Sequence, residues 1–391
     1  MIYLDNAATT KPSDGVVAKA LQYMTNDFGN AGSIYSFGVR ARQAVEEARQ
    51  QVADLISAEP DQIIFTSGGT EANNLALFGI QDYLRSINKT QIIISEGEHD
   101  SIFRAAKKMC IKGEFDVQIL PINSNGCVET SKLSSLLTPK TGLVSVMYVN
   151  NEVGAVNNII SIARECKKRG IIFHTDCVQA LGSVSVNVNK IQCDMMSISA
   201  HKIHGLKGVG ALYVKNPTLL QPLIIGGAQQ EHGFRGGTEN VPGIVAFGQA
   251  CLEAREKMGA VRFRLRKIKS IFLNKLTAEL NSQGLLAIFH DNGMSGCNDS
   301  KVLNLRFDGV DAETLILLLA TQDIIVSAGS ACHSHESKPS RVLQAIGLSP
   351  EEARNSIRVS FSGEETDKEV EDAAHSIVNC VSILLKSANN S

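Results

Sequence analysis

Three short segments of the chain carry side chains whose chemistry fits together. Lys202 follows an apolar run, Asp176 follows another run 26 residues earlier, and Ser67-Gly68-Gly69-Thr70 follows a third, directly before a helical pattern. A lysine that loses solvation can lose its charge, as Schiff-base chemistry requires. A carboxylate can hold a protonated ring nitrogen, and a glycine-rich helix start offers N–H groups to a phosphate. The three segments together indicate a site for an organic cofactor that carries a phosphate.

Each segment also has an ordinary explanation when it is taken alone. The glycines fit a common strand-to-helix turn, Asp176 fits a helix N-cap, and Lys202 fits a solvated surface lysine. The glycine segment is neither a Walker motif nor a GxGxxG turn. The three segments nevertheless occupy successive strand ends of one predicted sheet, where open α/β sheets bind ligands. A phosphate anchor, a pyridinium partner and a reactive lysine are what pyridoxal 5'-phosphate (PLP) needs, so we predict a PLP enzyme.

One of the nine cysteines is the candidate nucleophile. Cys332 lies in a polar segment, between Gly329-Ser330-Ala331 and His333-Ser334-His335. Other cysteines lie in helical or apolar patterns, where a thiol behaves as a small hydrophobe: Cys166, Cys193, Cys251 and Cys380. A thiol of ordinary pKa is only ~3% thiolate at pH 7, so a histidine or a proton transfer must activate Cys332. No further ligand pattern accompanies Cys332, His333 and His335, and we predict no metal site.

Alternating strands and helices must position these groups. We predict strands, several of them nearly all apolar, over residues 62–66, 91–95, 144–149, 171–175, 194–199 and 210–214. Helical patterns fill the intervals, for example over residues 38–56 and 160–169. This alternation predicts the α/β class, with a mainly parallel sheet covered by helices on both faces.

The pattern changes after about residue 260. We predict a helix over 261–280, a strand over 302–307, a helix over 311–322, strands over 324–327 and 357–361, and a last helix over 366–386. We therefore divide the chain into a large cofactor-binding domain, residues 12–260, and a smaller α+β domain, residues 1–11 and 261–391.

Composition excludes several classes of protein. The formal net charge is −2 and the pI about 6.5, so we predict no direct nucleic-acid binding. No apolar stretch approaches the ~20 residues of a membrane helix, and we predict no membrane insertion. Cysteines without CxxC pairs, together with an N-terminus unlike a secretory signal, predict reduced thiols and a cytoplasmic location.

The chain resembles the cysteine desulfurases, which are class V, fold-type I PLP enzymes. The motifs that carry the resemblance follow the family order over nearly the whole chain: Leu4-Asp5-Asn6-Ala7-Ala8-Thr9-Thr10, Thr66-Ser67-Gly68-Gly69-Thr70-Glu71, Asn150-Asn151-Glu152-Val153-Gly154, Ser199-Ala200-His201-Lys202, Arg235-Gly236-Gly237-Thr238-Glu239-Asn240, Ser327-Ala328-Gly329-Ser330-Ala331-Cys332 and Ser356-Ile357-Arg358. The resemblance implies a seven-stranded sheet like that of fold-type I aminotransferases.

It also implies a role for individual residues. The implied cofactor-binding residues are Gly69, Thr70, His99, Asn151, Asp176, Gln179, Ser199, His201, Lys202 and Thr238. Lys202 would attach PLP covalently, and His99 would stack on the pyridine ring, although His99 alone fits an ordinary histidine at a helix start. Asp176 would pair with the ring nitrogen and Gln179 with the ring hydroxyl. Thr238 would reach the phosphate from a second subunit.

Two residues, Asn151 and Arg358, would hold the substrate carboxylate, which suits an arginine fork. The catalytic set would be Lys202, Cys332 and His99. The implied reaction converts L-cysteine to L-alanine and leaves a persulfide on Cys332.

The resemblance further implies a homodimer and a protein sulfur acceptor, in iron–sulfur assembly, tRNA thiolation or DNA phosphorothioation. The segments Arg-Gly-Gly-Thr-Glu-Asn and Cys-His-Ser slightly favour a desulfurase that supplies sulfur to one specialised pathway, such as DNA phosphorothioation. Selenocysteine lyase is the closest alternative, since Glu98-His99-Asp100-Ser101 and Ala331-Cys332-His333-Ser334 are as similar to that branch. A PLP-dependent aminotransferase and a non-catalytic sulfur-relay scaffold are the others.

Overall fold

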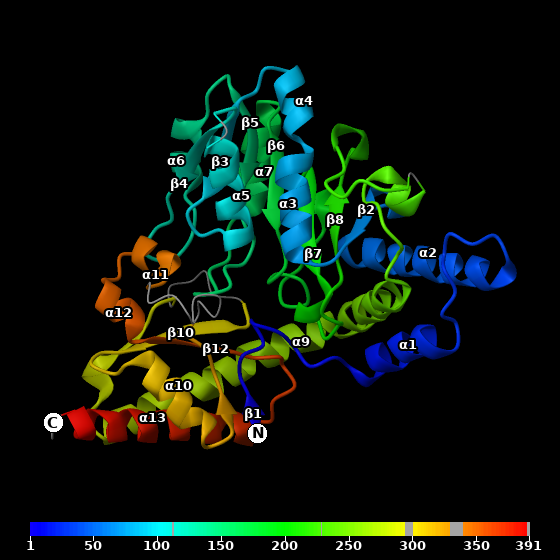
Figure 1. Cartoon of the computed structure of the whole chain (residues 1–391). Helices are drawn as coiled ribbons and strands as arrows, with labels where there is room; N and C mark the ends of the chain where they lie inside the picture. Colours follow the sequence, from blue (N-terminus) through cyan, green and yellow to red (C-terminus); the bar gives the residue numbers. More distant parts are fainter. Residues whose placement is uncertain (112, 228, 294–299, 329–338, 389–391) are drawn as a thin grey trace.

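The computed structural model describes residues 1–111, 113–227, 229–293, 300–328 and 339–388 (Figure 1). No helix in these ranges is both long and apolar enough to cross a membrane.

A large sheet forms the centre of the upper part of the molecule in Figure 1. Its strands are β2 (Ile63–Thr66), β3 (Gln91–Ser95), β4 (Asp116–Leu120), β5 (Thr141–Ser145), β6 (Ile172–Asp176), β7 (Met195–Ser199) and β8 (Gly210–Val214). Their order across the sheet is β2-β8-β7-β6-β5-β3-β4. Only β8 is antiparallel to its neighbours, β2 and β7, and all other pairs are parallel. The prediction of a mainly parallel, seven-stranded sheet is confirmed.

Helices cover both faces of this sheet, because side chains alternate between the faces along each strand. Ile64 packs with α3 (Gly69–Gly79), α4 (Gln81–Ser86) and α5 (Asp100–Ile111). Ile63 and Phe65 belong to the core of the other face. The helices of that core are α1 (Asp14–Thr25), α2 (Ser36–Ile56), α6 (Thr130–Leu136), α7 (Ile159–Lys168), α8 (Val188–Ile191), the first part of α9 (Val241–Ser282), and the short helices α11 (Arg341–Ala345) and α12 (Pro350–Arg354).

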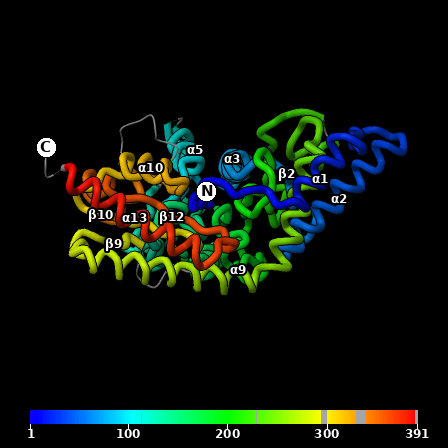
Figure 2. Tube along the Cα trace, turned by 90° about the horizontal axis from the view of Figure 1, so that it is seen from below, coloured from blue at the N-terminus to red at the C-terminus, as the bar shows by residue number. Residues whose placement is uncertain are grey.

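A second core lies in the lower part of the molecule in Figure 1. Its antiparallel sheet has the order β12-β10-β9, and a separate short parallel pair joins β1 to β11. Its elements are β1 (Ile2–Tyr3), β9 (Phe289–Asp291), β10 (Val302–Phe307), α10 (Ala312–Ala320), β11 (Ile324–Ile325), β12 (Ser356–Ser360) and α13 (Asp367–Ala388). Leu4 belongs to this core, and Figure 2 shows the N-terminal segment running from there to α1.

Shorter elements connect these layers. Two helices, α11 (Arg341–Ala345) and α12 (Pro350–Arg354), lie between β11 and β12 in the chain, and both begin at a serine N-cap. The 3-10 turns are η1 (Pro60–Gln62), η2 (Ala200–Lys202), η3 (Pro217–Leu219), η4 (Gln230–Gly233) and η5 (Leu286–Ile288).

The long helix α9 belongs to both cores. Val241 to Cys251 contribute to the core of the large sheet, and Leu265 to Leu280 contribute to the second core. The predicted helix over 261–280 is thus the second half of one helix of 42 residues. The predicted boundary between residues 260 and 261 falls inside α9, and the division into two domains stays a prediction.

The strand predictions differ from the structure at β5 and β4, and β9 is not predicted either. The run predicted over 144–149 is buried, but β5 begins three residues earlier, and the chain beyond it bonds to β6 through Tyr148 N and Asp176 O, 2.9 Å apart. Strand β4 was not predicted at all. It lies at the sheet edge, where polar and exposed residues leave no apolar run.

Candidate active site

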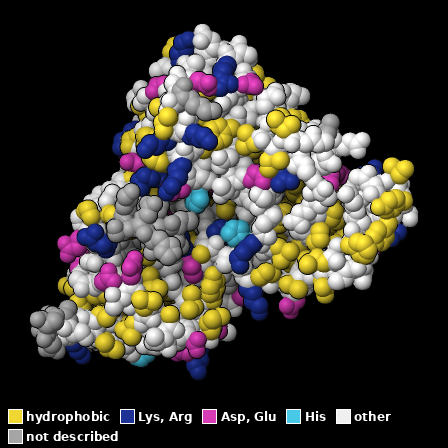
Figure 3. Space-filling view, viewed as in Figure 1, with side chains coloured by type: hydrophobic (Ala, Val, Ile, Leu, Met, Phe, Trp, Pro, Cys, Tyr) yellow, Lys and Arg dark blue, Asp and Glu magenta, His cyan; other side chains and the backbone are white. Residues whose placement is uncertain are grey.

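A cavity of about 460 Å³ opens at the carboxyl edge of the large sheet. Residues at or after the ends of four strands line it: Gly69 and Thr70 follow β2, Glu98 and His99 follow β3, and Asn151 follows β5. Ser199 is the last residue of β7, and Lys202 follows that strand. Asp176 at the end of β6 also lines it. In Figure 3, histidine and basic side chains gather around the middle of this face. The parallel strands therefore bring together groups that lie far apart in the sequence.

Lys202 lies in η2 and points at the N-terminal segment. Its Nζ donates hydrogen bonds to the carbonyl oxygens of Ala7 and Ala8, both at 2.6 Å. Burial, and then the positive charges of Lys301 and Arg358, lower the pKa of Lys202 to about 7. About half of the amine is therefore uncharged at pH 7, as a nucleophile or base requires.

Asp176 is the anchor of a hydrogen-bonded chain that ends at His99. Its Oδ1 accepts from the backbone N–H of Val178 at 2.9 Å, and its Oδ2 accepts from Asn73 Nδ2 at 2.7 Å. Asn73 Nδ2 also donates to Ser101 Oγ at 2.8 Å. The contacts fix the carboxylate of Asp176, which is only 4% exposed, at the side of the cavity.

Ser101 determines which nitrogen of His99 carries the proton. The backbone N–H of Ser101 donates to His99 Nδ1 at 3.1 Å, and Ser101 Oγ lies 2.8 Å from the same atom. Because Nδ1 accepts, the neutral ring carries its proton on Nε2. No sequence motif predicts a role for Ser101 or Asn73, although Asn73 lies one helical turn after Gly69, on the same face of α3.

The start of α3 has the geometry of an anion cradle. Gly68 has a φ of 150°, which favours glycine, and a Cβ at Gly69 would lie 2.6 Å from Val178 Cγ2, so the chain passes Val178 closely only because Gly69 has no side chain. Beside Gly69, Ser199 is 1% exposed and its Oγ has no partner within the described residues; a Cβ at Gly69 would lie 3.8 Å from Ser199 Cβ. Burial first, and then nearby lysines, lower the pKa of His201 to about 4, which makes it neutral at pH 7.

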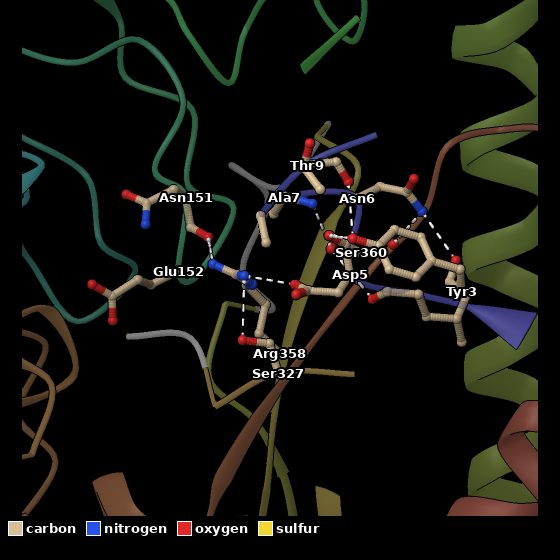
Figure 4. Close-up of polar contacts among 12 residues, drawn as sticks. Tyr3, Asp5, Asn6, Ala7, Thr9, Asn151, Glu152, Ser327, Arg358 and Ser360 are labelled. Atoms are coloured by element: carbon tan, nitrogen blue, oxygen red, sulfur yellow. Dashed lines mark hydrogen bonds and ion pairs between the residues drawn. The ribbon is translucent and has the colours of Figure 1, made fainter. Parts of the chain in front are cut away.

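Arg358, in β12, also lines the cavity, and Figure 4 shows its polar contacts. It is 2% exposed, and its NH2 group donates to Asp5 Oδ1 at 2.7 Å. Its NH1 group donates to the backbone oxygen of Asn151 at 3.0 Å, while the Asn151 side chain points away in Figure 4. Ser327 Oγ accepts from the same guanidinium at 3.3 Å. The contact with Asp5 spans 353 residues and was not predicted.

Glu98 is a further cavity residue for which the sequence predicts no role. It is 1% exposed, and its Oε1 accepts from Ser95 Oγ at 2.7 Å and from Met147 N at 2.6 Å. Burial is the main cause that raises the pKa of Glu98 to about 8. The carboxyl beside His99 is therefore mostly protonated and uncharged at pH 7.

Ten predicted site residues line the cavity together: Gly69, Thr70, His99, Asn151, Asp176, Gln179, Ser199, His201, Lys202 and Arg358. Thr238 is exposed and does not line it. Cys332 lies outside the described residues, and its role stays a prediction. On either side of it in the chain, Ser327 contacts Arg358, and Arg341 lines the cavity with its guanidinium 4.1 Å from the centre of the Phe103 ring.

A second cavity, of about 400 Å³, lies at the opposite edge of the large sheet. Tyr83, Lys167, Asp194 and Lys215 are among its lining residues. Its polar groups have ordinary structural partners: Asp194 Oδ2 accepts from Phe173 N at 2.9 Å, and Lys167 Nζ donates to Gln192. Among the described residues, we find no arrangement of reactive groups at this edge.

The chain belongs to the class-V aminotransferase family, whose model matches residues 2–372. Among curated proteins, it is 39% identical to "Cysteine desulfurase IscS" of Colwellia psychrerythraea over 97% of this chain and 92% of the relative. Among solved structures, a "NifS-like protein" has a TM-score of 0.89 and 32% identity over 98% of this chain and 99% of that one. The structure titled "SspA in complex with cysteine" has a TM-score of 0.78 and 30% identity, over 94% and 100%.

The family predicted from the sequence motifs is confirmed by these relatives. Class-V aminotransferases and cysteine desulfurases depend on PLP, so the protein is a PLP-dependent enzyme.

Proposed function

We propose that the protein is a cysteine desulfurase, which takes sulfur from L-cysteine as a persulfide on Cys332 and passes it to a protein acceptor. The observation that carries the proposal is Lys202, an amine with a pKa near 7 in a cavity that also presents Asp176, His99 and Arg358. The similarity to proteins named cysteine desulfurase, over nearly the whole chain, supports it.

The cavity fits PLP chemically. Two buried polar atoms in its wall, Ser199 Oγ and Gln179 Oε1, have no partner within the described residues and suit a phosphate and a ring hydroxyl. The N–H groups at Gly69 and Thr70 suit the phosphate, and the carboxylate of Asp176 suits the ring nitrogen. When bound, PLP supplies an electron sink for the charge that develops at the substrate's α-carbon.

The protein's own groups would handle the substrate and its protons. Arg358 would bind the carboxylate of cysteine, and Asp5 holds the guanidinium in place. The uncharged amine of Lys202 would accept the α-proton, and Asp176 would hold a proton on the ring nitrogen. His99 would present its Nε2–H to the ring or to a leaving group.

Cys332 would perform the sulfur transfer. Its thiolate forms a bond to the substrate sulfur while the bond between that sulfur and the β-carbon breaks, and the electron pair stays with the carbon. The carbon then takes a proton and leaves as alanine, and the sulfur stays as a persulfide. Ser327 lies five residues before Cys332 and contacts Arg358 at the cavity, which supports a Cys332 thiol that reaches the cavity.

A cysteine substitution with a matched control tests this role. We expect Cys332→Ser to retain the visible absorption of bound PLP and to lose more than about 10²-fold in sulfide release from cysteine. Cys110→Ser, which changes an exposed thiol away from the cavity, should leave sulfide release unchanged. Full sulfide release by the Cys332→Ser variant would disprove the assignment.

We further propose a homodimer in which Thr238 contributes to the partner's cofactor site. Thr238 is exposed in the single chain, and large apolar side chains are also exposed along α1 and the segment after it: Leu21, Met24, Phe28, Ile34 and Tyr35. Figure 3 shows apolar surface gathered over α1 and α2. Such a patch is typical of a protein interface. The molar mass in solution, by light scattering, tests the dimer, and a monomer that binds PLP at full affinity would contradict it.

The acceptor and the location complete the proposal. Iron–sulfur scaffolds, tRNA-thiolating enzymes and DNA-phosphorothioation machinery are the candidate acceptors, and a pull-down with persulfide trapping would separate them. We place the protein in the cytoplasm, where the described cysteines, all free thiols, would stay reduced.

A further inference from the structure

A second lysine is buried directly behind Lys202. Lys301 comes just before β10, is 4% exposed, and does not line the cavity. Its Nζ donates a hydrogen bond to the backbone oxygen of Lys202 at 3.1 Å. Within the described part of the chain, no carboxylate forms an ion pair with Lys301. The function assigned so far uses Lys202 and leaves Lys301 without a role.

Burial of an ammonium group without an ion-pair partner is costly. Burial and the charge of Arg358 lower the pKa of Lys301 to about 8, and Glu365 opposes this shift. Lys301 therefore remains about nine-tenths charged at pH 7. Glu365 accepts hydrogen bonds from Ser362 and from the N–H of Gly363, and within the described residues it forms no ion pair with Lys301, so it opposes the charge of Lys301 without direct contact.

The other charges around Lys202 compensate one another better. Arg358 is positive, but its guanidinium is paired with Asp5 at 2.7 Å. Asp176 is negative and is engaged by Asn73 and by a backbone N–H. His201, in the same turn as Lys202, is neutral at pH 7. Lys207 acts on His201, whereas the two positive groups that act on Lys202 itself are Lys301 and Arg358. Of these two, only Lys301 has no ion-paired carboxylate within the described residues.

We propose that Lys301 is a positioning residue, which favours the uncharged form of the Lys202 amine by repulsion and holds the backbone of Lys202 by a hydrogen bond. The inference deepens the proposed function, because it rests on Lys202 as the reactive lysine. Two like charges in one low-dielectric wall favour the state in which one of them has lost its proton.

Three substitutions at Lys301 separate charge from hydrogen bonding. Lys301→Gln keeps a donor for the Lys202 oxygen and removes the charge, Lys301→Met removes both, and Lys301→Arg keeps both. The pH at which Lys202 gains its proton is measured on the full chain without PLP, by competitive amine labelling and mass spectrometry. In the holoenzyme, the pH dependence of the cofactor's visible absorption gives a second readout.

We expect the midpoint for Lys202 to rise by roughly one pH unit in the Gln and Met variants and to stay near the wild-type value in the Arg variant. Labelling of Lys202 at pH 7 should then fall about fivefold in the Gln and Met variants. If the Lys202 midpoint stayed at the wild-type value in both Lys301→Gln and Lys301→Met, the proposal would be overturned. A shift in Lys301→Met alone would also overturn it, since that result would assign the effect to the hydrogen bond and not to the charge.

Thermal unfolding distinguishes this role from a purely structural one. A lysine that serves only the fold should lower Tm when it is replaced, whereas we expect Lys301→Met to keep or raise Tm while the Lys202 midpoint moves. A lower Tm with an unmoved midpoint would contradict us. The labelling requires neither cofactor nor turnover, so a moved midpoint in a chain without desulfurase activity would sink the proposed function and leave this inference standing.

Discussion

The two cavities at opposite edges of the large sheet have similar volumes, about 460 and 400 Å³, and very different chemistry. Both contain lysine and aspartate. At the carboxyl edge, Lys202 is partly uncharged, Glu98 is mostly protonated and Ser199 has no partner within the described residues. At the amino edge, Asp194 instead accepts a hydrogen bond from the backbone of β6. Volume therefore does not identify the site. Burial also raises the pKa of Asp194, so the site is identified by several such groups together, Lys202 and Glu98 beside the unpartnered Ser199 Oγ.

The largest expected effect separates two lysines, one from each cavity. Lys202→Ala should lower sulfide release by more than about 10³-fold, because both the attachment point for PLP and the base are lost. Lys215→Ala, at the amino edge, should stay within about twofold of wild type, since Lys215 is exposed. Steady-state rates on cysteine check both. If both variants lost sulfide release to the same extent, the two cavities could not be distinguished by their lysines.

The two aspartates give the next contrast. Asp176→Asn removes a charge that a protonated ring nitrogen needs, and loss of a charge-assisted hydrogen bond of ~1.5–3 kcal/mol should lower the rate by roughly 10- to 150-fold. Asp194→Asn should change the rate less than about threefold, because its contact is structural. Rates and PLP affinity, the latter by absorption titration, measure the difference. A normal rate in the Asp176→Asn variant would contradict the ring-nitrogen role.

Substitutions at Arg358 test the part of the carboxyl-edge cavity that β12, a strand of the second core, contributes. A lysine side chain cannot form a bidentate fork, so Arg358→Lys should raise KM for cysteine about tenfold and change kcat less. Asp5→Asn should raise KM by a smaller factor, because it loosens the guanidinium without removing it. A change in kcat with constant KM would place Arg358 in the chemical step and not in binding.

The smallest effect on activity, and a clear one on stability, concerns Glu98. Its pKa is raised from 4.5 to about 8 in the folded chain. Between these two pH values the folded chain holds a proton that the unfolded chain has released, so wild-type stability falls as the pH rises through this window. Glu98→Gln has no such proton. The variant should therefore gain up to a few kcal/mol relative to wild type between about pH 5 and pH 8. Parallel curves of unfolding free energy against pH would contradict this.

Much of the carboxyl-edge site is predictable from the sequence, because strand ends are local features. Apolar runs followed by Asp176 or by Lys202 define both the strand and the residue that leaves it, and parallel strands bring such residues to one edge. The strand positions are less certain where a buried run continues past the sheet, as at residues 146–149. Edge strand β4 lacks the apolar run on which prediction depends.

The remaining parts of the site depend on contacts between distant segments. Asp5 meets Arg358 across 353 residues, Lys301 meets the backbone of Lys202 across 99, and Asn73 meets Asp176 across 103. No periodicity in the sequence encodes such a contact. The protonation states of Lys202 and Glu98 depend on burial as well, and burial is a property of the folded chain.

Helix α9 has a consequence for how the enzyme can move. Its 42 residues, ~63 Å at the usual helical rise, pass without interruption from one core into the other. A swing of the two halves about a hinge would have to bend this helix and disturb packing at both of its ends. Substrate should therefore reach Lys202 through a local rearrangement at the cavity mouth, while the two cores keep their positions relative to each other.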